Sequence, residues 1–395
     1  MKTSKLLLLL ALVPAACDPG VLSPEASEPV AGSVSLPEVA RLLSELPIGG
    51  EQLSEVHAAV SASARNGYDE EYTMRDLFET PGAGVGDRAG KASGADRQYG
   101  TPMRRLIEDH LRDRYRTKGG ETDGEAVQAY LDALAASDAQ IYWPYSEEYD
   151  GASLPVITFD PGGDASTNVG YRTRIDASGN RRVEEIVVDE EYARTHPVWV
   201  VNNNSDSGYT SLEMRRRDNP EWGQGGEVLV KGGAEDAESS RMLVLKYFKM
   251  NRNYDSWFGG ASEFFIKCGS VNGFKAKTES EMKDFAPTVT DFMIVVKRRD
   301  LNTFRPFNAI LISEWTDQMD DFCLLVTEDD GGTQTSWKCS ATVKVQSKSY
   351  GFDLDIPYRD RDDIVWRGTL ARGFFERQSG ITGSFGDVEL VFGFI

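Results

Sequence analysis

Acidic residues gather in four short segments of the C-terminal half, and their chemistry is that of cation binding. The segments are residues 251–260, 299–307, 329–333 and 358–363, and each separates two runs rich in apolar residues. Ca²⁺ takes about six to eight oxygen ligands and is well served by loops rich in aspartate. The aspartates of these segments are Asp255, Asp300, Asp329, Asp330, Asp360, Asp362 and Asp363.

The runs between these segments are typical of antiparallel strands, which would bring the acids together. Phe352, Leu354 and Ile356 alternate with two aspartates, which is the period of a half-buried strand. Consecutive antiparallel strands alternate in direction, so every second connection lies at the same end. We therefore expect the four segments to share one end of a sandwich. The predicted Ca²⁺ ligands are Asp329, Asp330, Asp360 and Asp362.

An alternative interpretation of this end needs no cation. Arg359 and Arg361 interleave with the aspartates, and an opposite charge within about 4–6 Å stabilises a carboxylate. The two arginines would then neutralise the acids, and the loop end would be a solvated acidic surface.

The wider patterning places the chain in the α+β class. Residues 36–137 carry apolar residues at helical spacing, and residues 138–225 form a β-rich middle region. Residues 240–395 contain eight or nine short strand-like runs separated by turn residues, which indicates an antiparallel β-sandwich. Its acidic end resembles the calcium end of C2-type sandwiches. A jelly-roll-like order of strands is the other arrangement that fits.

The string DEEY occurs twice, at residues 69–72 and 189–192. Aspartate caps the free N–H groups at a helix start, and glutamates oppose the positive end of the helix dipole. We therefore expect a helix to begin at each copy. The alternative is that the paired carboxylates perform acid–base chemistry.

The N-terminus indicates export. Lys2 and Lys5 precede an apolar run of eight residues, Leu6 to Val13, which is too short for a bilayer span of about 20 residues. Small residues then lead to Cys17. This pattern resembles the lipobox of bacterial lipoproteins, in which the cysteine is acylated, although Pro14 departs from the usual aliphatic residue. The alternative is a secreted protein cleaved after Ala15.

The lipoprotein resemblance implies a division of the first 35 residues. Residues 1–16 would be the signal peptide, and residues 17–35 the lipidated Cys17 and a flexible tether rich in Pro, Ser and Gly. Such a tether reaches about 55 Å at about 3.1 Å per residue. The expected location is the bacterial cell envelope, on the outer membrane or cell surface, with the lipid as the membrane contact.

The negative net charge of the chain argues against nucleic acid as a partner. The chain carries a net charge of −20 from 43 basic and 63 acidic residues. Cleavage after residue 16 would remove two lysines and leave 41 basic against 63 acidic residues, a net charge of −22. Phosphate binding needs clustered Lys and Arg, so we expect no nucleic acid partner.

Beyond Cys17 the chain has three cysteines, two of which could pair. Residues 321–343 have the pattern of a hairpin centred on Gly331, which would place Cys323 opposite Cys339. Opposed cysteines in an exported protein can form a disulfide. The alternative is two free thiols in neighbouring strands.

Residues 141–145 concentrate aromatic side chains. Tyr142, Trp143 and Tyr145 lie close to several carboxylates, and exposed aromatic rings in such a setting can stack on sugars. The alternative is that they fill the core, where aromatic residues dominate packing.

The chain lacks the catalytic patterns HExxH, GxSxG and GxxxxGK[ST]. It resembles the envelope lipoproteins of Bacteroidota-like bacteria that end in a β-sandwich. This resemblance implies no activity. The anchor, the tether, the sandwich and the lack of catalytic motifs favour a non-enzymatic protein of unknown specificity that binds a ligand, such as a glycan or an envelope protein, or assists assembly. The alternative is a hydrolase that cleaves glycan or peptide with carboxylates such as Glu147, Glu148 and Asp150. No catalytic residue is assigned.

Overall fold

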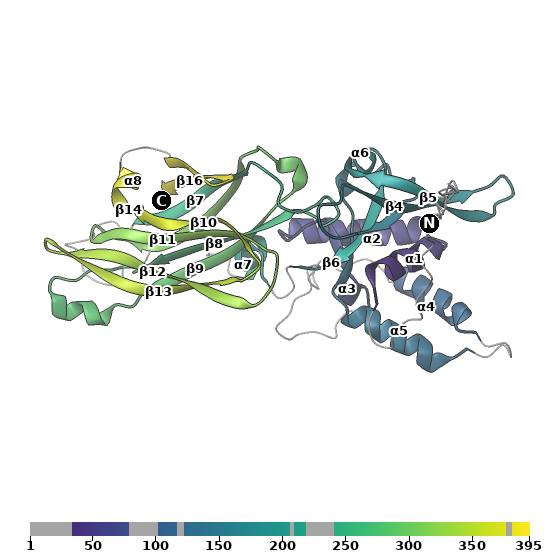
Figure 1. Cartoon of the computed structure of the whole chain (residues 1–395), viewed down its shortest axis with the longest axis horizontal. Helices are drawn as coiled ribbons and strands as arrows, with labels where there is room; N and C mark the ends of the chain where they lie inside the picture. The colour runs from purple at the N-terminus through teal and green to yellow at the C-terminus, as the bar shows by residue number, and fades with distance from the viewer. Residues whose placement is uncertain (1–33, 79–101, 117–121, 206–208, 219–240, 377–380) are drawn as a thin grey trace, which may run out of the picture. The chain divides into compact units, whose positions relative to one another are not determined.

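The computed structural model describes residues 34–78, 102–116, 122–205, 209–218, 241–376 and 381–395 (Figure 1). Residues 32–395 belong to one packed unit. The predicted signal peptide, Cys17 and most of the tether lie outside the described residues.

The first region, residues 36–137, is helical over most of its described length, as its apolar spacing predicted. Helix α1 begins at a capping box, in which the Ser35 N–H donates to Glu38 Oε2 at 3.0 Å. Asp123 caps α5 by accepting from the Ala126 N–H at 3.0 Å. The helices are α1 (Leu36–Glu45), α2 (Gly50–Arg65), α4 (Pro102–Arg114) and α5 (Gly124–Ala136), with a short α3 (Met74–Phe78).

A six-stranded sheet forms beside these helices, in the order β1-β2-β6-β3-β4-β5. Strands β3 and β6 run parallel, and the other neighbours run antiparallel. The strands are β1 (Glu71–Thr73), β2 (Ala139–Tyr142), β3 (Val156–Phe159), β4 (Thr167–Ile175), β5 (Arg181–Asp189) and β6 (Val198–Asn203).

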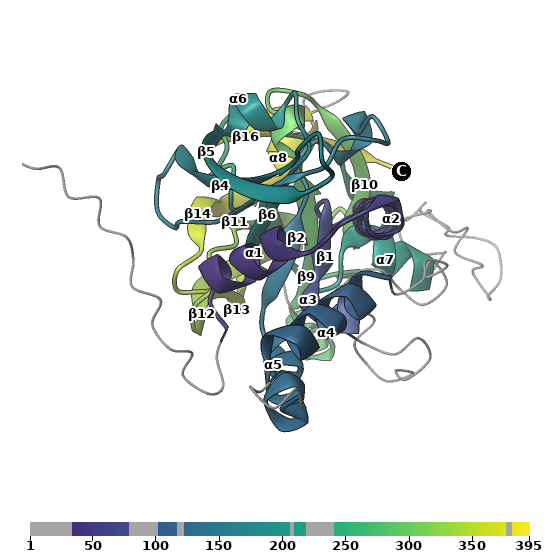
Figure 2. The same cartoon turned by 90° about the vertical axis from the view of Figure 1, so that its right-hand side faces the viewer.

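Both faces of the central strand β6 are buried. On β6, Trp199 and Val201 pack with the helices, and Val198 and Val200 belong to a second cluster on the other face. Helix α1 lies over β4 and β6 (Figure 2). The helical region and the β-rich middle region therefore share one core, so the expected boundary at residue 137 does not separate two packing units.

The C-terminal region forms two sheets that share one core. One has the order β10-β7-β16-β15, and the other has the order β13-β12-β11-β8-β9, with β14 paired to β11. Phe248 and Leu245 of the first sheet lie in the same apolar cluster as Phe264 and Leu324 of the second. The fold is therefore α+β with a sandwich-like C-terminal arrangement, as the patterning predicted.

Ten strands form in the described part of this region, where the patterning predicted eight or nine. They are β7 (Arg241–Met250), β8 (Ser262–Ser270), β9 (Thr288–Val296), β10 (Arg305–Trp315), β11 (Met319–Glu328), β12 (Gln334–Val345), β13 (Lys348–Arg359), β14 (Asp363–Ala371), β15 (Ile381–Phe385) and β16 (Val388–Phe394). Helix α8 (Arg372–Glu376) and 3₁₀ turns at Glu279–Asp284 and Arg298–Asp300 lie between them.

Helix α7 (Leu212–Asp218) belongs to the sandwich rather than to the middle region. Leu212 is buried in the sandwich core, and Ser211 forms an isolated bridge with Met293 of β9. The end of the expected middle region, residues 138–225, therefore packs on the sandwich core and not on the N-terminal sheet.

The predicted hairpin around Gly331 forms only at its open end, between β11 and β12, where Met319↔Val343 has the predicted register and Asp321↔Thr342 is shifted by one residue. Beyond Asp321, β14 pairs with β11 on one side and β8 pairs from Cys323 onward. Strand β14, which is distant in the sequence, thus occupies the edge of β11 that the local pattern assigned to β12. Strand β12 pairs instead with β13 along its whole length.

The cysteine side chains nevertheless meet. Cys323 stands opposite Gly269 and Thr369 in its sheet, and Cys339 stands opposite Leu354. The Cys323 and Cys339 side chains still contact each other. Both are free thiols in the structure, as is Cys268.

Candidate functional site

Three carboxylates meet at the predicted acidic end of the sandwich. Asp255 comes from the connection between β7 and β8, Glu263 is the second residue of β8, and Glu328 is the last residue of β11. Each offers one oxygen, and these oxygens all lie within 4.8 Å of one another. Two oxygens on opposite sides of one Ca²⁺ are about 5 Å apart, since each Ca²⁺–oxygen distance is about 2.3–2.6 Å. The spacing therefore admits Ca²⁺.

The cluster is withdrawn from water. Glu328 is 1% exposed and Glu263 is 8% exposed. Among the described residues, no group donates a hydrogen bond to Glu328 Oε1 or Asp255 Oδ2. A buried polar atom without a partner costs about 1–3 kcal/mol, and more when it is charged, so these oxygens need a neutralising group.

The raised pKa values of Glu328 and Asp255 also indicate that the cluster needs a neutralising group. Burial and the neighbouring Asp255 raise the pKa of Glu328 to about 12. Burial also raises the pKa of Asp255 to about 6, against the opposing effect of its contact with Glu328. Like charges at such a distance cannot all ionise in a low dielectric. The cluster must therefore hold either protons or a cation, and its all-oxygen donor set suits a hard cation such as Ca²⁺.

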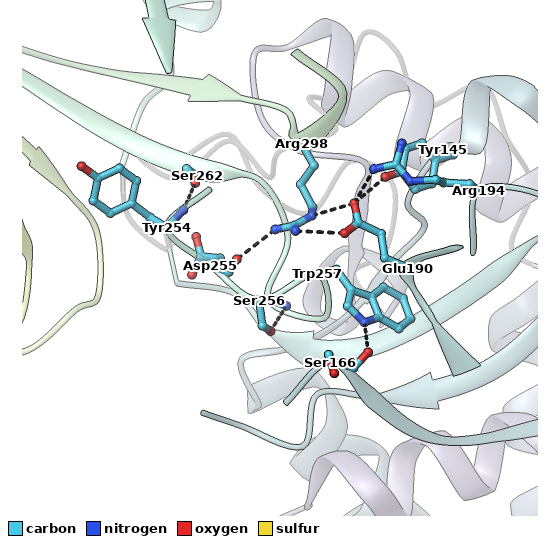
Figure 3. A network of polar contacts seen from close by, with 11 residues as sticks. Tyr145, Ser166, Glu190, Arg194, Tyr254, Asp255, Ser256, Trp257, Ser262 and Arg298 are labelled. Carbon is cyan, nitrogen blue, oxygen red and sulfur yellow. Dashed lines mark hydrogen bonds and ion pairs between the residues drawn. The ribbon is translucent and has the colours of Figure 1, made fainter. Parts of the chain in front are cut away.

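A bidentate ion pair holds the Asp255 connection in place (Figure 3). The Arg298 guanidinium donates to the Asp255 carbonyl at 2.9 Å and to both Glu190 oxygens at 3.2 and 3.3 Å. Glu190 also accepts from the Tyr145 hydroxyl and from Arg194, each at 2.8 Å. Although burial opposes it, these bonds lower the pKa of Glu190, so it remains an anion for Arg298.

Of the four predicted ligands, Asp330 influences this cluster electrostatically. Its charge raises the pKa of both Asp255 and Glu328. Asp329 and Asp362 lie beside each other, outside the group of three. Asp360 accepts from the Thr333 N–H at 2.8 Å and orders its own loop.

Arginines accompany these other aspartates, as the alternative interpretation anticipated. Arg359 lies 3.5 Å from Asp329, whose side chain is fully buried. The charge of Arg361 lowers the pKa of Asp330, against the dominant effect of burial. Arg359 therefore contacts both acids, since its guanidinium pairs with Asp329 and its backbone N–H donates to Asp362 at 2.9 Å. The group of carboxylates with the spacing of a cation site is instead Asp255, Glu263 and Glu328.

Glu263 and Glu328 are not among the predicted ligands, because those ligands all come from the segments that connect strands. Both lie inside strand-like runs, SEFFIKC and DFCLLVTE. The signal that could have found them is a glutamate in an otherwise apolar strand, since charged side chains are almost never fully buried unless paired.

The aromatic residues proposed for sugar stacking fill the core. Tyr142 and Trp143 are buried, and Trp143 packs edge-on against Trp199 and Tyr149. Tyr145 is half-buried, with its hydroxyl on Glu190 and Arg194 over its ring. These positions match the core-filling alternative.

The acids proposed for hydrolysis lie apart from the cluster. Glu147, Glu148 and Asp150 are exposed. Glu147 pairs with Arg299, and Asp150 accepts from the Ala152 and Ser153 N–H groups at 2.9 and 2.8 Å. These bonds lower the pKa of Asp150 to about 2, which favours a turn-stabilising anion over a general acid.

Comparison with protein-family models, curated proteins and solved structures found no match to this chain. Within the described ranges, no helix combines the length and apolar character needed to cross a bilayer. The function is therefore inferred from the residues of this chain alone.

Proposed function

We propose that this chain is an exported, lipid-anchored protein of the bacterial cell envelope that binds Ca²⁺ and acts by binding rather than by catalysis. The anchor is Cys17, and the cation ligands are Asp255, Glu263 and Glu328. The biological ligand would be a glycan or another envelope protein. A C2-like description of the sandwich belongs to the same proposal.

One observation carries the cation assignment. Three carboxylate oxygens from three separate chain segments lie within 4.8 Å, and Glu328 is 1% exposed with one oxygen that accepts no hydrogen bond from the described residues. Desolvating one carboxylate costs several kcal/mol. A divalent cation would offset that cost for Glu328 and Asp255 together.

A binding role fits the surrounding geometry better than hydrolysis. The acids of the hydrolase alternative are occupied, since Glu147 pairs with Arg299 and Asp150 orders a turn. The cluster itself is buried, and a catalytic carboxyl needs to reach the atom that it protonates.

The test is thermal unfolding of the mature protein with Ca²⁺ and with chelator, alongside Glu328→Gln. A cation at 100 times its Kd stabilises the folded state by about 2.7 kcal/mol, so Ca²⁺ should raise the melting temperature of the wild type clearly. Glutamine has nearly the same shape and no charge, so the variant should fold but lose the Ca²⁺ response.

The exposed Glu314→Gln on β10 is the matched control and should respond to Ca²⁺ like the wild type. A wild type that melts at one temperature in Ca²⁺ and in chelator would sink the proposal. So would a Glu328→Gln protein with an unchanged Ca²⁺ response. Mg²⁺ at the same concentration tests the preference for the larger cation, because Mg²⁺ demands shorter distances.

A further inference from the structure

Strand β5 forms one edge of the N-terminal sheet, and among the described residues only β4 pairs with it. Strand β3 pairs with β4 at Tyr171 and Arg172 alone, so the end of the β4–β5 hairpin extends past the start of β3 (Figure 1). A strand at an edge presents unpaired backbone N–H and C=O groups, which can bond to another strand. The hairpin therefore offers a template for a partner strand.

The turn of this hairpin is ordered by its own hydrogen bonds. Asp176 Oδ1 accepts from the Ser178 and Asn180 N–H groups, each at 2.9 Å. The Asp176 N–H donates to the Asn180 carbonyl at 2.9 Å, and Gly179 supplies a positive φ of +82°. The edge is thus preformed, and a partner strand would not have to order it.

One face of the hairpin exposes apolar side chains. Ile175, Val183 and Val187 are 59%, 44% and 72% exposed. Ile175 stands opposite Arg181, and side chains alternate along a strand, so the three lie on the same face. The next residue, Val188, points to the other face and is fully buried. A neighbouring strand that covers the exposed side chains would remove apolar surface from water, which is favourable.

The charged side chains of β5 have an order that is complementary to itself. Residues 181–185 read RRVEE. Two copies of this segment that run antiparallel about Val183 place Arg181 opposite Glu185 and Arg182 opposite Glu184, and each pair occurs twice. Opposite charges directly across from each other stabilise an antiparallel pair, whereas like charges destabilise it. The charges of β5 therefore match those of a second copy.

The geometry of the ladder leaves few other registers. Opposed residues in an antiparallel pair are either both hydrogen-bonded or both not, so the register changes in steps of two residues. One such step sets Arg182 against its own copy, and a step in the other direction sets Glu184 against its own copy. Charges on an edge strand usually oppose pairing. Here they favour one register and oppose its neighbours.

Arg182 gains most from such a partner. Within its own hairpin it stands opposite Arg174. Glu184, the acid of the same face, pairs with both Arg172 and Arg174, and among the described residues no acid pairs with Arg182. A carboxylate offers about four lone-pair sites, so Glu184 of the second copy can accept from Arg182 as well.

We propose that this chain forms a two-fold symmetric dimer in which β5 pairs antiparallel with β5 of a second copy about Val183, so that the two N-terminal sheets become one. Pairing of the same surface on both subunits is the commonest arrangement of homo-oligomers. Helix α1 packs on the interior strands β3, β4 and β6, so it does not occupy the outer edge of β5. The inference is independent of the cation site.

The experiment compares Val183→Cys with Val187→Cys in the purified mature protein. The two-fold axis puts residue 183 beside its own copy, whereas residue 187 would lie opposite Gly179. Opposed Cα atoms are about 4.5–5.5 Å apart, which suits a disulfide. A mild thiol oxidant takes two electrons and two protons from two such thiols and leaves a disulfide between the chains. Electrophoresis without reductant measures the linked dimer.

We expect at least tenfold more linked dimer from Val183→Cys than from Val187→Cys. The two valines are exposed on the same face of one strand, so the control matches the variant in chemistry. Equal linkage in both variants would indicate random collision, and linkage in neither would indicate an unpaired edge. Either result overturns the proposal, as would sedimentation of the wild type as a monomer at every protein concentration.

Adding Arg182→Glu to Val183→Cys tests the register. This change sets acids against each other across the interface, but within the hairpin it places an acid opposite Arg174, so the fold should be kept. Linkage should fall at least fivefold at an unchanged melting temperature. The control Lys275→Glu makes the same charge change at an exposed position outside the hairpin and should leave linkage as it was. Linkage that persists with Arg182→Glu would show that the proposed register is wrong.

Discussion

At the scale of single residues, buried carboxyl groups recur in this protein, and their surroundings neutralise them in different ways. Glu328 and Asp255 contact each other and are the proposed cation ligands, whereas the partly exposed Asp291 lies 3.4 Å from the buried Lys267 ammonium. Glu55 is stabilised by neutral hydrogen-bond donors instead, since it accepts from the Met103 N–H at 2.6 Å and from the Tyr72 hydroxyl at 3.1 Å. Burial nevertheless raises the pKa of Glu55.

The raised pKa of Glu55 predicts a pH dependence of stability. The folded state keeps the Glu55 proton at pH values where the unfolded chain, with a pKa near 4.5, has lost it. Its contribution is therefore full below that pH and is lost as pH rises through the folded pKa, by at most about 1.4 kcal/mol per pH unit. Glu55→Gln should show a shallower fall in unfolding free energy between pH 5 and pH 8.

Denaturant unfolding at several pH values checks this slope, whatever offset the substitution adds at low pH. Glu51→Gln, on the exposed face of the same helix, is the control and should keep the wild-type slope. Equal slopes for the wild type and Glu55→Gln would show that Glu55 ionises freely in the folded state.

At the scale of elements, the two DEEY strings show how context overrides a local signal. Asp189 caps α6 (Glu190–Ala193), because its side chain accepts from the Tyr192 N–H at 2.7 Å. The first copy leads into β1 instead, and Asp69 turns to the Ala261 N–H. The helix prediction is confirmed for residues 189–192 and wrong for residues 69–72, where pairing with β2 takes the backbone bonds.

The cysteines give a prediction at the same scale. The Cys323 and Cys339 side chains contact each other across β11 and β12, although the two residues do not share a ladder pair. If the protein resides in an oxidising envelope, as proposed, we expect an envelope thiol oxidant to take up two electrons and two protons from these thiols and leave a Cys323–Cys339 disulfide, while the buried Cys268 remains a thiol. A bridge between these strands would fasten the β12–β13 hairpin to β11.

Alkylation of the protein purified from the envelope, followed by mass spectrometry of its peptides, checks the pairing. The expected result is a linked Cys323–Cys339 peptide and an unmodified Cys268 that becomes accessible only on unfolding. Alkylation of both Cys323 and Cys339 without prior reduction would contradict it.

At the scale of the whole molecule, the proposal depends on where the chain resides. If Cys17 is acylated, Cys17→Ser should move the protein from the membrane fraction to the soluble fraction, because the lipid supplies the membrane affinity. Fractionation of cells that express each form measures this. A variant that stays with the membranes would argue for another means of attachment.

Much of the architecture follows from local periodicity. The four N-terminal helices and the strand-like runs of residues 240–395 appear as predicted, because burial of one face imposes a period on the sequence. Strand parity likewise placed residues 251–260 and 329–333 at one end, where Asp255 lies within electrostatic reach of Asp330. These features depend on neighbours in the sequence, and so they can be read from it.

The cluster itself was decided by tertiary structure. Glu263 and Glu328 become neighbours only because β8 pairs with β11, and β14 displaces β12 from the other edge of β11. Asp69 likewise accepts from the Ala261 N–H, which lies 192 positions later in the chain. Sequence alone determined the residue types and the loops that carry them. Which acids share a buried space depends on competition among distant strands, and no local pattern records its outcome.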